Sequence, residues 1–189
     1  MQTIIRGADI NFEKYDFENL GQIFDLIQIN NYVILKIIAD GIDITNYANS
    51  EIENIKPIEE VEVIVQDKEK LTKESIEEAK RYLPKLISGV DSIIDKFVND
   101  KEMVGFKMLS DAIQGFQWIN IFINNLVSEN LLSQNDEKSF KEWQEIFPEF
   151  LNALEKQDIV LVNDLLEYEI KPLLKKFDDI VTNININEK

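Results

Sequence analysis

Three glutamates in the second half of the chain have a spacing that could support chemistry. Glu142, Glu145 and Glu149 lie three and four residues apart, so a helix would place their carboxylates on one face. Inside a helical bundle such carboxylates can hold two iron ions, but that site also takes a histidine from each of two helices. The chain has no histidine. We therefore interpret these glutamates as a solvated helix face, and we expect neither a metal nor a cofactor.

The absence of histidine and cysteine restricts the chemistry of the whole chain. It excludes disulfides, thiol catalysis, thiolate zinc sites and histidine general bases, and a serine nucleophile would have no histidine to activate it. No glycine-rich phosphate loop occurs either. Catalysis by carboxylates or lysines stays open. Histidine is the commonest acid–base residue, however, so we predict that the protein is not an enzyme.

Asp40-Gly41-Ile42-Asp43 faintly resembles a calcium loop. The twelve-residue pattern with a closing glutamate is missing. An Asp-Gly pair between two apolar runs favours a two-residue turn with positive φ. We therefore predict a β-hairpin turn at this position.

The charge of the chain bears on its partners. The net charge is −16 and the only arginines are Arg6 and Arg81, which argues against nucleic acid because phosphate affinity comes from Lys and Arg. Residues 51–80 are rich in acidic side chains and also contain five lysines. We interpret this run as a solvated surface and linker, with the alternative that it docks a basic partner.

No segment predicts membrane insertion or export. The N-terminal residues turn acidic before any apolar run long enough for a signal peptide. The most apolar run, residues 118–127, is interrupted by asparagines and is too short to span a bilayer. We expect a cytoplasmic protein.

The candidate partner-binding residues lie mainly between residues 102 and 128. Apolar residues there cover more than one helical stripe, so this helix is either central to the core or presents a second face. The second face could pack on the N-terminal part of the chain, on a partner helix or on a second copy. The side chains that we single out for a partner are Phe116, Trp118, Phe122 and Tyr168.

Residues 1–70 predict a small α+β module. We expect a β-hairpin near 33–46, a strand near 61–66 and one helix near 17–29 with Asp16 as a plausible N-cap. Residues 3–5 could add a further strand, and Pro57 would lie in the loop before the last strand.

Residues 72–184 predict a four-helix bundle. Apolar residues recur at spacings of three and four, and the first such stripe comprises Ile76, Ala79, Leu83, Leu86, Val90, Ile93 and Phe97. We expect helices near 73–98 (capped by Thr72), 102–128, from 133–136 to 156, and 158–183, with a disordered tail at 185–189. The predicted fold class is α+β, predominantly α: the N-terminal module followed by a kinked up-down four-helix bundle made of two helical hairpins.

Three prolines fall inside these helices and account for the expected kinks. Pro84, Pro148 and Pro172 each remove a helical hydrogen bond. The antiparallel arrangement places Pro84 about level with Gly115 and Pro172 opposite Trp143. A glycine at the first position would allow the backbones to approach closely.

Four segments together resemble an uncharacterised family of small acidic bacterial proteins. They are Ile37-Ile38-Ala39-Asp40-Gly41-Ile42-Asp43-Ile44, Glu59-Glu60-Val61-Glu62-Val63, Glu78-Ala79-Lys80-Arg81-Tyr82-Leu83-Pro84 and Leu165-Leu166-Glu167-Tyr168-Glu169-Ile170. The resemblance covers nearly the whole chain and implies a bacterial cytoplasmic origin. It implies no activity and no functional residues.

Three functions remain open from the sequence. The leading hypothesis is a non-enzymatic protein-interaction module, an adaptor or a chaperone-like bundle, because apolar residues are in excess and no catalytic set is present. The second is a self-associating homodimer. The third, a small-ligand binder, would need a concave pocket with convergent polar groups, for which the sequence shows no candidate.

Overall fold

The computed structural model describes residues 2–7, 17–46 and 58–184. The chain divides into two compact units, Met1–Glu74 and Ser75–Lys189, each with its own hydrophobic core. The predicted cap Asp16, the loop around Pro57 and the tail at 185–189 lie outside the described residues.

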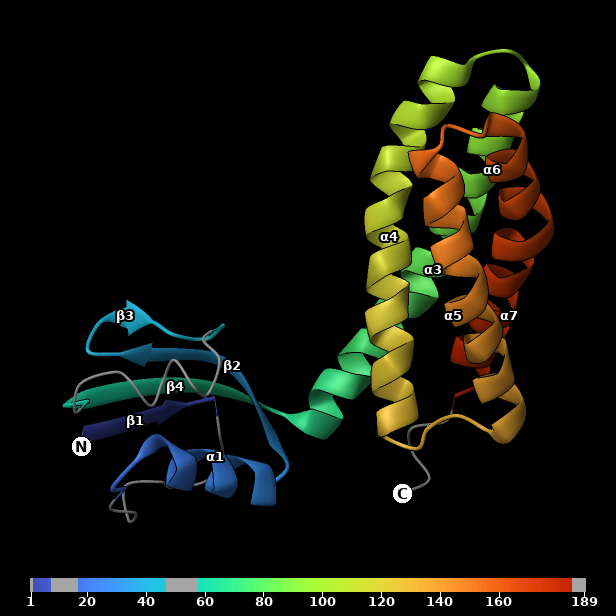
Figure 1. The fold of residues 1–189 in the computed structure, drawn as a ribbon. Coiled ribbons are helices and arrows are strands. Elements are labelled where there is room, and N and C mark those ends of the chain that lie inside the picture. Colours follow the sequence, from blue (N-terminus) through green and yellow to red (C-terminus); the bar gives the residue numbers. More distant parts are fainter. Residues whose placement is uncertain (1, 8–16, 47–57, 185–189) are drawn as a thin grey trace. The chain divides into compact units, whose positions relative to one another are not determined.

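The first unit contains a four-stranded mixed sheet with strand order β1-β4-β2-β3 (Figure 1). The strands are β1 (Gln2–Arg6), β2 (Tyr32–Ala39), β3 (Ile42–Asp43) and β4 (Glu60–Asp67). β1 runs parallel to β4, whereas β2 pairs antiparallel with β3 and β4. Val61, Val63 and Val65 alternate along β4 and are buried, which is the pattern that indicated a half-buried strand.

Asp40 and Gly41 form the predicted hairpin turn between β2 and β3. Both have positive φ, 47° and 80°, and Ala39 pairs with Ile42 across the turn. The Asp40 carboxylate accepts hydrogen bonds from the backbone N–H groups of Glu59 and Glu60, at 3.1 and 2.8 Å. Asp40 therefore has a structural role: its carboxylate fixes the backbone at the start of β4.

Helix α1 (Leu20–Ile29) covers one face of the sheet and buries Leu20, Ile23 and Ile27. It begins three residues later than predicted, because Asn19 accepts a hydrogen bond from the Gln22 N–H at 3.1 Å and caps the helix.

The second unit is a bundle of antiparallel helices (Figure 1). They are α3 (Lys68–Val98), which starts in the first unit, α4 (Glu102–Ser128), α5 (Gln134–Glu155), and a last helix in three parts. Those parts are α6 (Ile159–Leu165), the π-helical turn η2 (Leu166–Ile170) and α7 (Lys171–Asn183). The predicted α+β, predominantly α class is confirmed.

The start of α3 was predicted wrongly. The helix begins at Lys68, directly after β4, and the Asp67 carboxylate accepts a hydrogen bond from the Lys70 N–H at 2.8 Å. Thr72, the predicted cap, lies inside the helix, and its hydroxyl donates to the Lys68 carbonyl at 2.8 Å. Charged residues at 68–70 carry no apolar stripe, so periodicity did not indicate this first turn.

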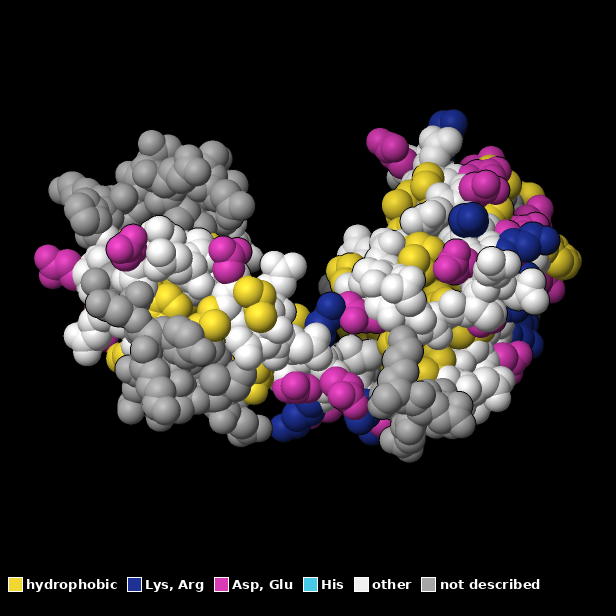
Figure 2. Space-filling view, turned by 90° about the horizontal axis from the view of Figure 1, so that it is seen from below, with side chains coloured by type: hydrophobic (Ala, Val, Ile, Leu, Met, Phe, Trp, Pro, Cys, Tyr) yellow, Lys and Arg dark blue, Asp and Glu magenta, His cyan; other side chains and the backbone are white. Residues whose placement is uncertain are grey.

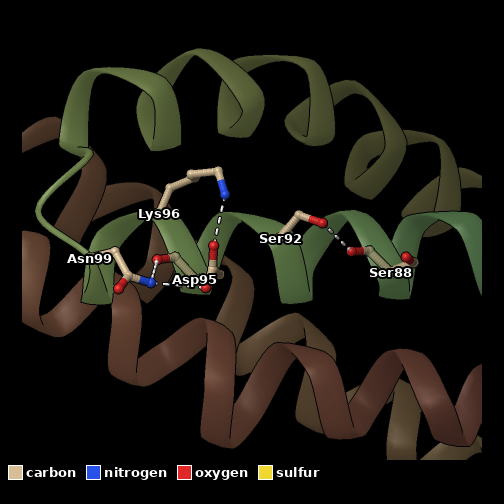
Figure 3. A network of polar contacts seen from close by, with 5 residues as sticks. All are labelled: Ser88, Ser92, Asp95, Lys96 and Asn99. Carbon is tan, nitrogen blue, oxygen red and sulfur yellow. Dashed lines mark hydrogen bonds and ion pairs between the residues drawn. The ribbon is translucent and has the colours of Figure 1, made fainter.

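The three turns of the bundle share one helix-ending geometry. Asp100, Asn130 and Gln157 have φ between 53° and 55°, and the next residue in each case donates its N–H to the carbonyl five positions back. At the end of α3, the Asn99 amide also donates to the Asp95 carbonyl at 2.8 Å (Figure 3). No glycine is needed at Asp100 and Asn130, because Asp and Asn tolerate the left-handed conformation. Gln157 adopts the same conformation without that preference.

Gly115 of α4 lies against Tyr82 and Leu86 of α3, the residues two positions before and after Pro84, which agrees with the predicted level of Pro84. A Cβ at Gly115 would lie 2.3 Å from the Tyr82 hydroxyl and 3.0 Å from Leu86 Cδ1. Pro84 and Pro148 lie within the continuous helices α3 and α5, and their side chains are exposed. Helices α3 and α4 can therefore approach closely at Gly115, because glycine has no side chain to keep them apart.

Candidate functional site

A single π-helical turn interrupts the last helix of the bundle. The Lys171 N–H donates to the Leu166 carbonyl, five residues back, and Pro172 follows with no N–H to donate. Leu166 and Ile170 at the ends of the turn are fully buried. Tyr168, which lies between them, is 65% exposed. The two buried side chains fix the turn against the core, and the tyrosine ring faces solvent.

A shallow groove lies beside this turn, between α5 and the η2–α7 segment. Its volume is about 230 Å³. The lining residues are Glu142, Glu145, Ile146, Tyr168, Glu169, Pro172, Leu173 and Lys176. Pro172 thus lies near the α5 positions adjacent to Trp143, close to where the sequence placed it.

The groove carries more negative than positive charge. The Lys176 ammonium contacts the Glu142 carboxylate at 2.9 Å, and this hydrogen bond lowers the pKa of Glu142. Within the described part of the chain, no ion pair involves Glu145 or Glu169. The two carboxylates are therefore available to a cation from outside.

Substitution of Lys176 by methionine is expected to raise the pKa of Glu142, because the carboxylate loses its hydrogen bond and its nearest positive charge. A lowered pKa means that the contact stabilises the fold above the pKa of the unfolded carboxyl and is lost as pH falls through the folded value. NMR titration of the Glu142 side-chain carbon measures the shift. Lys175→Met is the matched control, and an equal shift in that variant would contradict the assignment.

The four residues predicted to bind a partner do not form one surface. Phe116 and Phe122 are 0% and 4% exposed and belong to the core, so we withdraw both as partner contacts. Trp118 is half-buried and stacks on Phe122 with ring centroids 5.4 Å apart. Only Tyr168 is plainly exposed, and it lies in the groove.

The three glutamates predicted to form one solvated face of α5 have different surroundings in the structure. Glu142 and Glu145 line the groove, whereas Glu149 on the next turn of α5 does not. Among the described residues, no cluster of three or more acidic side chains has a geometry that could hold a metal ion. No sequence pattern indicates the groove, since Tyr168 and Glu169 come from a different helix and meet the α5 carboxylates only in the fold.

The acidic run at 51–80 is partly paired. Residues 51–57 lie outside the described residues. In α3, Lys73 and Lys80 form ion pairs with Glu69 and Glu77 at 2.5 and 2.8 Å. On the face of the bundle drawn at the right of Figure 2, acidic, basic and apolar side chains are interspersed. The ion-paired side chains of α3 are partly or largely exposed, which agrees with a solvated surface for that part of the run, whereas residues 60–67 form strand β4 of the sheet and are not a linker.

Three comparisons relate the chain to known proteins. Residues 74–180 match the family model described as Domain of unknown function (DUF8042), which covers most of the bundle. No curated protein and no solved structure matches the chain. None of the helices in the described residues combines the length and apolar character needed to cross a membrane.

Proposed function

The chain belongs to the DUF8042 family, and from that premise we propose that it is a non-enzymatic protein-interaction module, an adaptor or a chaperone-like helical bundle. The observation that carries this proposal is the groove beside η2, where an exposed tyrosine adjoins two carboxylates without a cationic partner in the described chain. We further propose a bacterial origin and a cytoplasmic location, with neither nucleic acid nor membrane insertion involved.

The size of the groove favours a peptide side chain over a small molecule. Pockets for small ligands usually enclose about 300–1,000 Å³ and bury most of the ligand. The groove is smaller, about 230 Å³, and open to solvent. It suits one or two side chains of a segment that lies across the surface, which makes the small-ligand alternative the weaker proposal.

The lining of the groove favours a basic segment. The Tyr168 ring offers a face for a cation, worth about 0.5–1 kcal/mol at an exposed site. Glu145 and Glu169 supply acceptors for a Lys or Arg side chain, and Pro172, Ile146 and Leu173 supply apolar contacts. The partner is therefore a protein segment with Lys or Arg next to an apolar residue.

Selection of a random-sequence peptide library on the full chain tests this proposal. We expect the enriched peptides to carry Lys or Arg beside an apolar residue and to bind with Kd values of about 1–100 μM, as measured by fluorescence anisotropy. Charge reversal at Glu145→Lys and Glu169→Lys together should weaken binding by about tenfold or more. Higher salt should also weaken it.

The matched control is the double variant Glu149→Lys and Glu155→Lys, which makes the same charge change on α5 outside the groove. Equal weakening in both variants would show that only net charge matters and would remove the groove from the proposal. Enrichment of peptides without basic residues would remove the basic partner.

Self-association as a homodimer is the second candidate function. A different face of the bundle, the outer side of α4, favours it, so the two functions do not compete for one surface.

A further inference from the structure

The outer face of α4 differs from the rest of this strongly charged chain. Charged residues occur in α4 only at Glu102, Lys107 and Asp111. From residue 112 to residue 128 none occurs, although 30% of the chain is charged. The uncharged stretch is not explained by burial alone, because it includes solvent-exposed positions.

Five of the six exposed positions of this stretch form one stripe, and the sixth, Asn125, lies next to it. Gln114, Gln117, Ile121, Asn124 and Ser128 are all exposed and follow each other at spacings of three and four residues. Ile121 at the centre is 60% exposed. We call these five residues the α4 stripe. Such spacing keeps a stripe on one side of a helix over about 20 Å, which is how helices present a seam to a partner helix.

The other helices of the bundle show what an ordinary solvent face looks like in this protein. Charged side chains occupy many of the exposed positions of α3, α5 and α7, namely Glu77, Glu78, Arg81, Lys85, Asp91, Asp95, Lys138, Lys141, Glu145, Glu149, Glu155, Lys175, Lys176 and Asp179. The α4 stripe contains amides, a hydroxyl and an isoleucine instead.

Charge decides which partner suits this face. Each chain carries a net charge of −16, so two copies repel one another wherever acidic surfaces meet. A face free of charge is where like-charged copies can approach most closely, and interface centres are depleted of charged residues. A basic partner would gain nothing from a neutral stripe. We propose that the α4 stripe is the contact between two copies of this chain, which pair α4 against α4 about a two-fold axis.

The residue types suit such a symmetric contact. Glutamine and asparagine side chains carry both donors and acceptors, so each amide can pair with an amide of the other copy. Ile121 lies at the middle of the stripe and meets its own counterpart near the axis. Half-buried Trp118 lies one turn before Ile121 and extends the apolar centre.

The dimer is expected to be weak. One pair of helices in contact over about 20 Å buries less than the roughly 800 Å² per partner of a standard interface. Sedimentation velocity of the full chain from about 1 to 300 μM should show a monomer–dimer equilibrium in the micromolar range. Raising NaCl from about 0.05 to 0.5 M should strengthen association, because salt screens the repulsion between the acidic copies.

Variants at the centre of the stripe make the test specific. Ile121→Glu and Ile121→Lys should each weaken self-association by about tenfold or more, since like charges then meet at the axis. An equimolar mixture of the two should associate again, because the glutamate of one copy faces the lysine of the other. Val160→Glu, a charge added at a position 73% exposed on α6, should leave the equilibrium unchanged. Circular dichroism confirms that each variant is folded.

A wild-type chain that stays monomeric at every concentration and salt would overturn the proposal, and so would an Ile121→Glu variant that dimerises normally. Failure of the mixture to associate would exclude the two-fold α4 contact. Salt separates this proposal from peptide binding in the groove: salt strengthens the first and weakens the second, so either can fail while the other holds.

Discussion

Replacing Trp143 by alanine is expected to lower the free energy of unfolding by about 3–5 kcal/mol, the range for deleting a buried aromatic side chain. Trp143 is fully buried on α5 and contacts aromatic rings from three helices. Its ring centroid lies 6.0 Å from that of Phe116, 5.1 Å from that of Phe147 and 5.7 Å from that of Phe177. Its loss leaves a cavity where the helices meet.

Urea unfolding followed by circular dichroism at the helical band measures this effect, because the helical signal comes mainly from the bundle. The loss would be a large fraction of the free energy of unfolding of a typical domain, which is about 5–15 kcal/mol. Tyr168→Ala is the control, because that side chain is 65% exposed and its removal should cost about 0.5 kcal/mol or less.

Trp143→Phe separates packing from hydrogen bonding. The indole N–H of Trp143 has no hydrogen-bond partner among the described residues, so its removal breaks no bond. We expect this variant to lose less than half as much stability as Trp143→Ala. Equal losses would show that the N–H contributes to the fold and would contradict the packing argument.

Gly115→Ala is the second substitution for which we expect a large effect, a loss of about 1–2 kcal/mol. The new methyl group would lie 2.3 Å from the Tyr82 hydroxyl, so the side chain or the helix must move. Overpacking costs about 1–3 kcal/mol. Alanine gains up to about 1 kcal/mol over glycine in a helix, which offsets part of that cost.

Gly89→Ala supplies a control with identical chemistry and the opposite sign. A Cβ at Gly89 in α3 would meet no atom within 4 Å apart from the adjoining backbone of its own helix, so only the helix preference of alanine remains, and stability should rise by up to about 1 kcal/mol. Tyr82→Phe, combined with Gly115→Ala, should restore part of the loss, since it removes the nearest atom. Stabilisation by Gly115→Ala alone would show that α3 and α4 separate at little cost.

Apolar periodicity predicts the buried side of α3 but not that of α4. The buried residues of α3 are the same ones that its spacing predicted, because most of its other positions are charged or polar and its further apolar side chains, such as Ile87 and Ile94, flank the stripe and are only partly buried. In α4, apolar residues cover more than one side, so spacing could not indicate that Phe116 and Phe122 face the core while Ile121 faces solvent. Neighbouring helices decided this, since they determine which side is covered.

Of the residues that line the groove, the sequence predicts only Tyr168 as a partner-binding residue. No pattern in the sequence predicts the π-helical turn or the carboxylates that lie beside Tyr168. Pro172 signalled an irregular hydrogen-bond pattern, but a proline can be accommodated by a bend, a break or a wide turn. The packing of Leu166 and Ile170 in the core decided among these.

By itself the sequence determined the fold class, the Asp40-Gly41 hairpin, the α3 stripe and the absence of histidine and cysteine chemistry. These depend on local patterns and on composition, which need no knowledge of neighbours. Only the tertiary structure decided that Glu142 and Glu145 meet Tyr168 and Glu169, and that the uncharged residues 112–128 of α4 include exposed positions. Both depend on how the helices pack. Packing determines which side chains contact one another and which face solvent, and the order of residues along the chain does not show this.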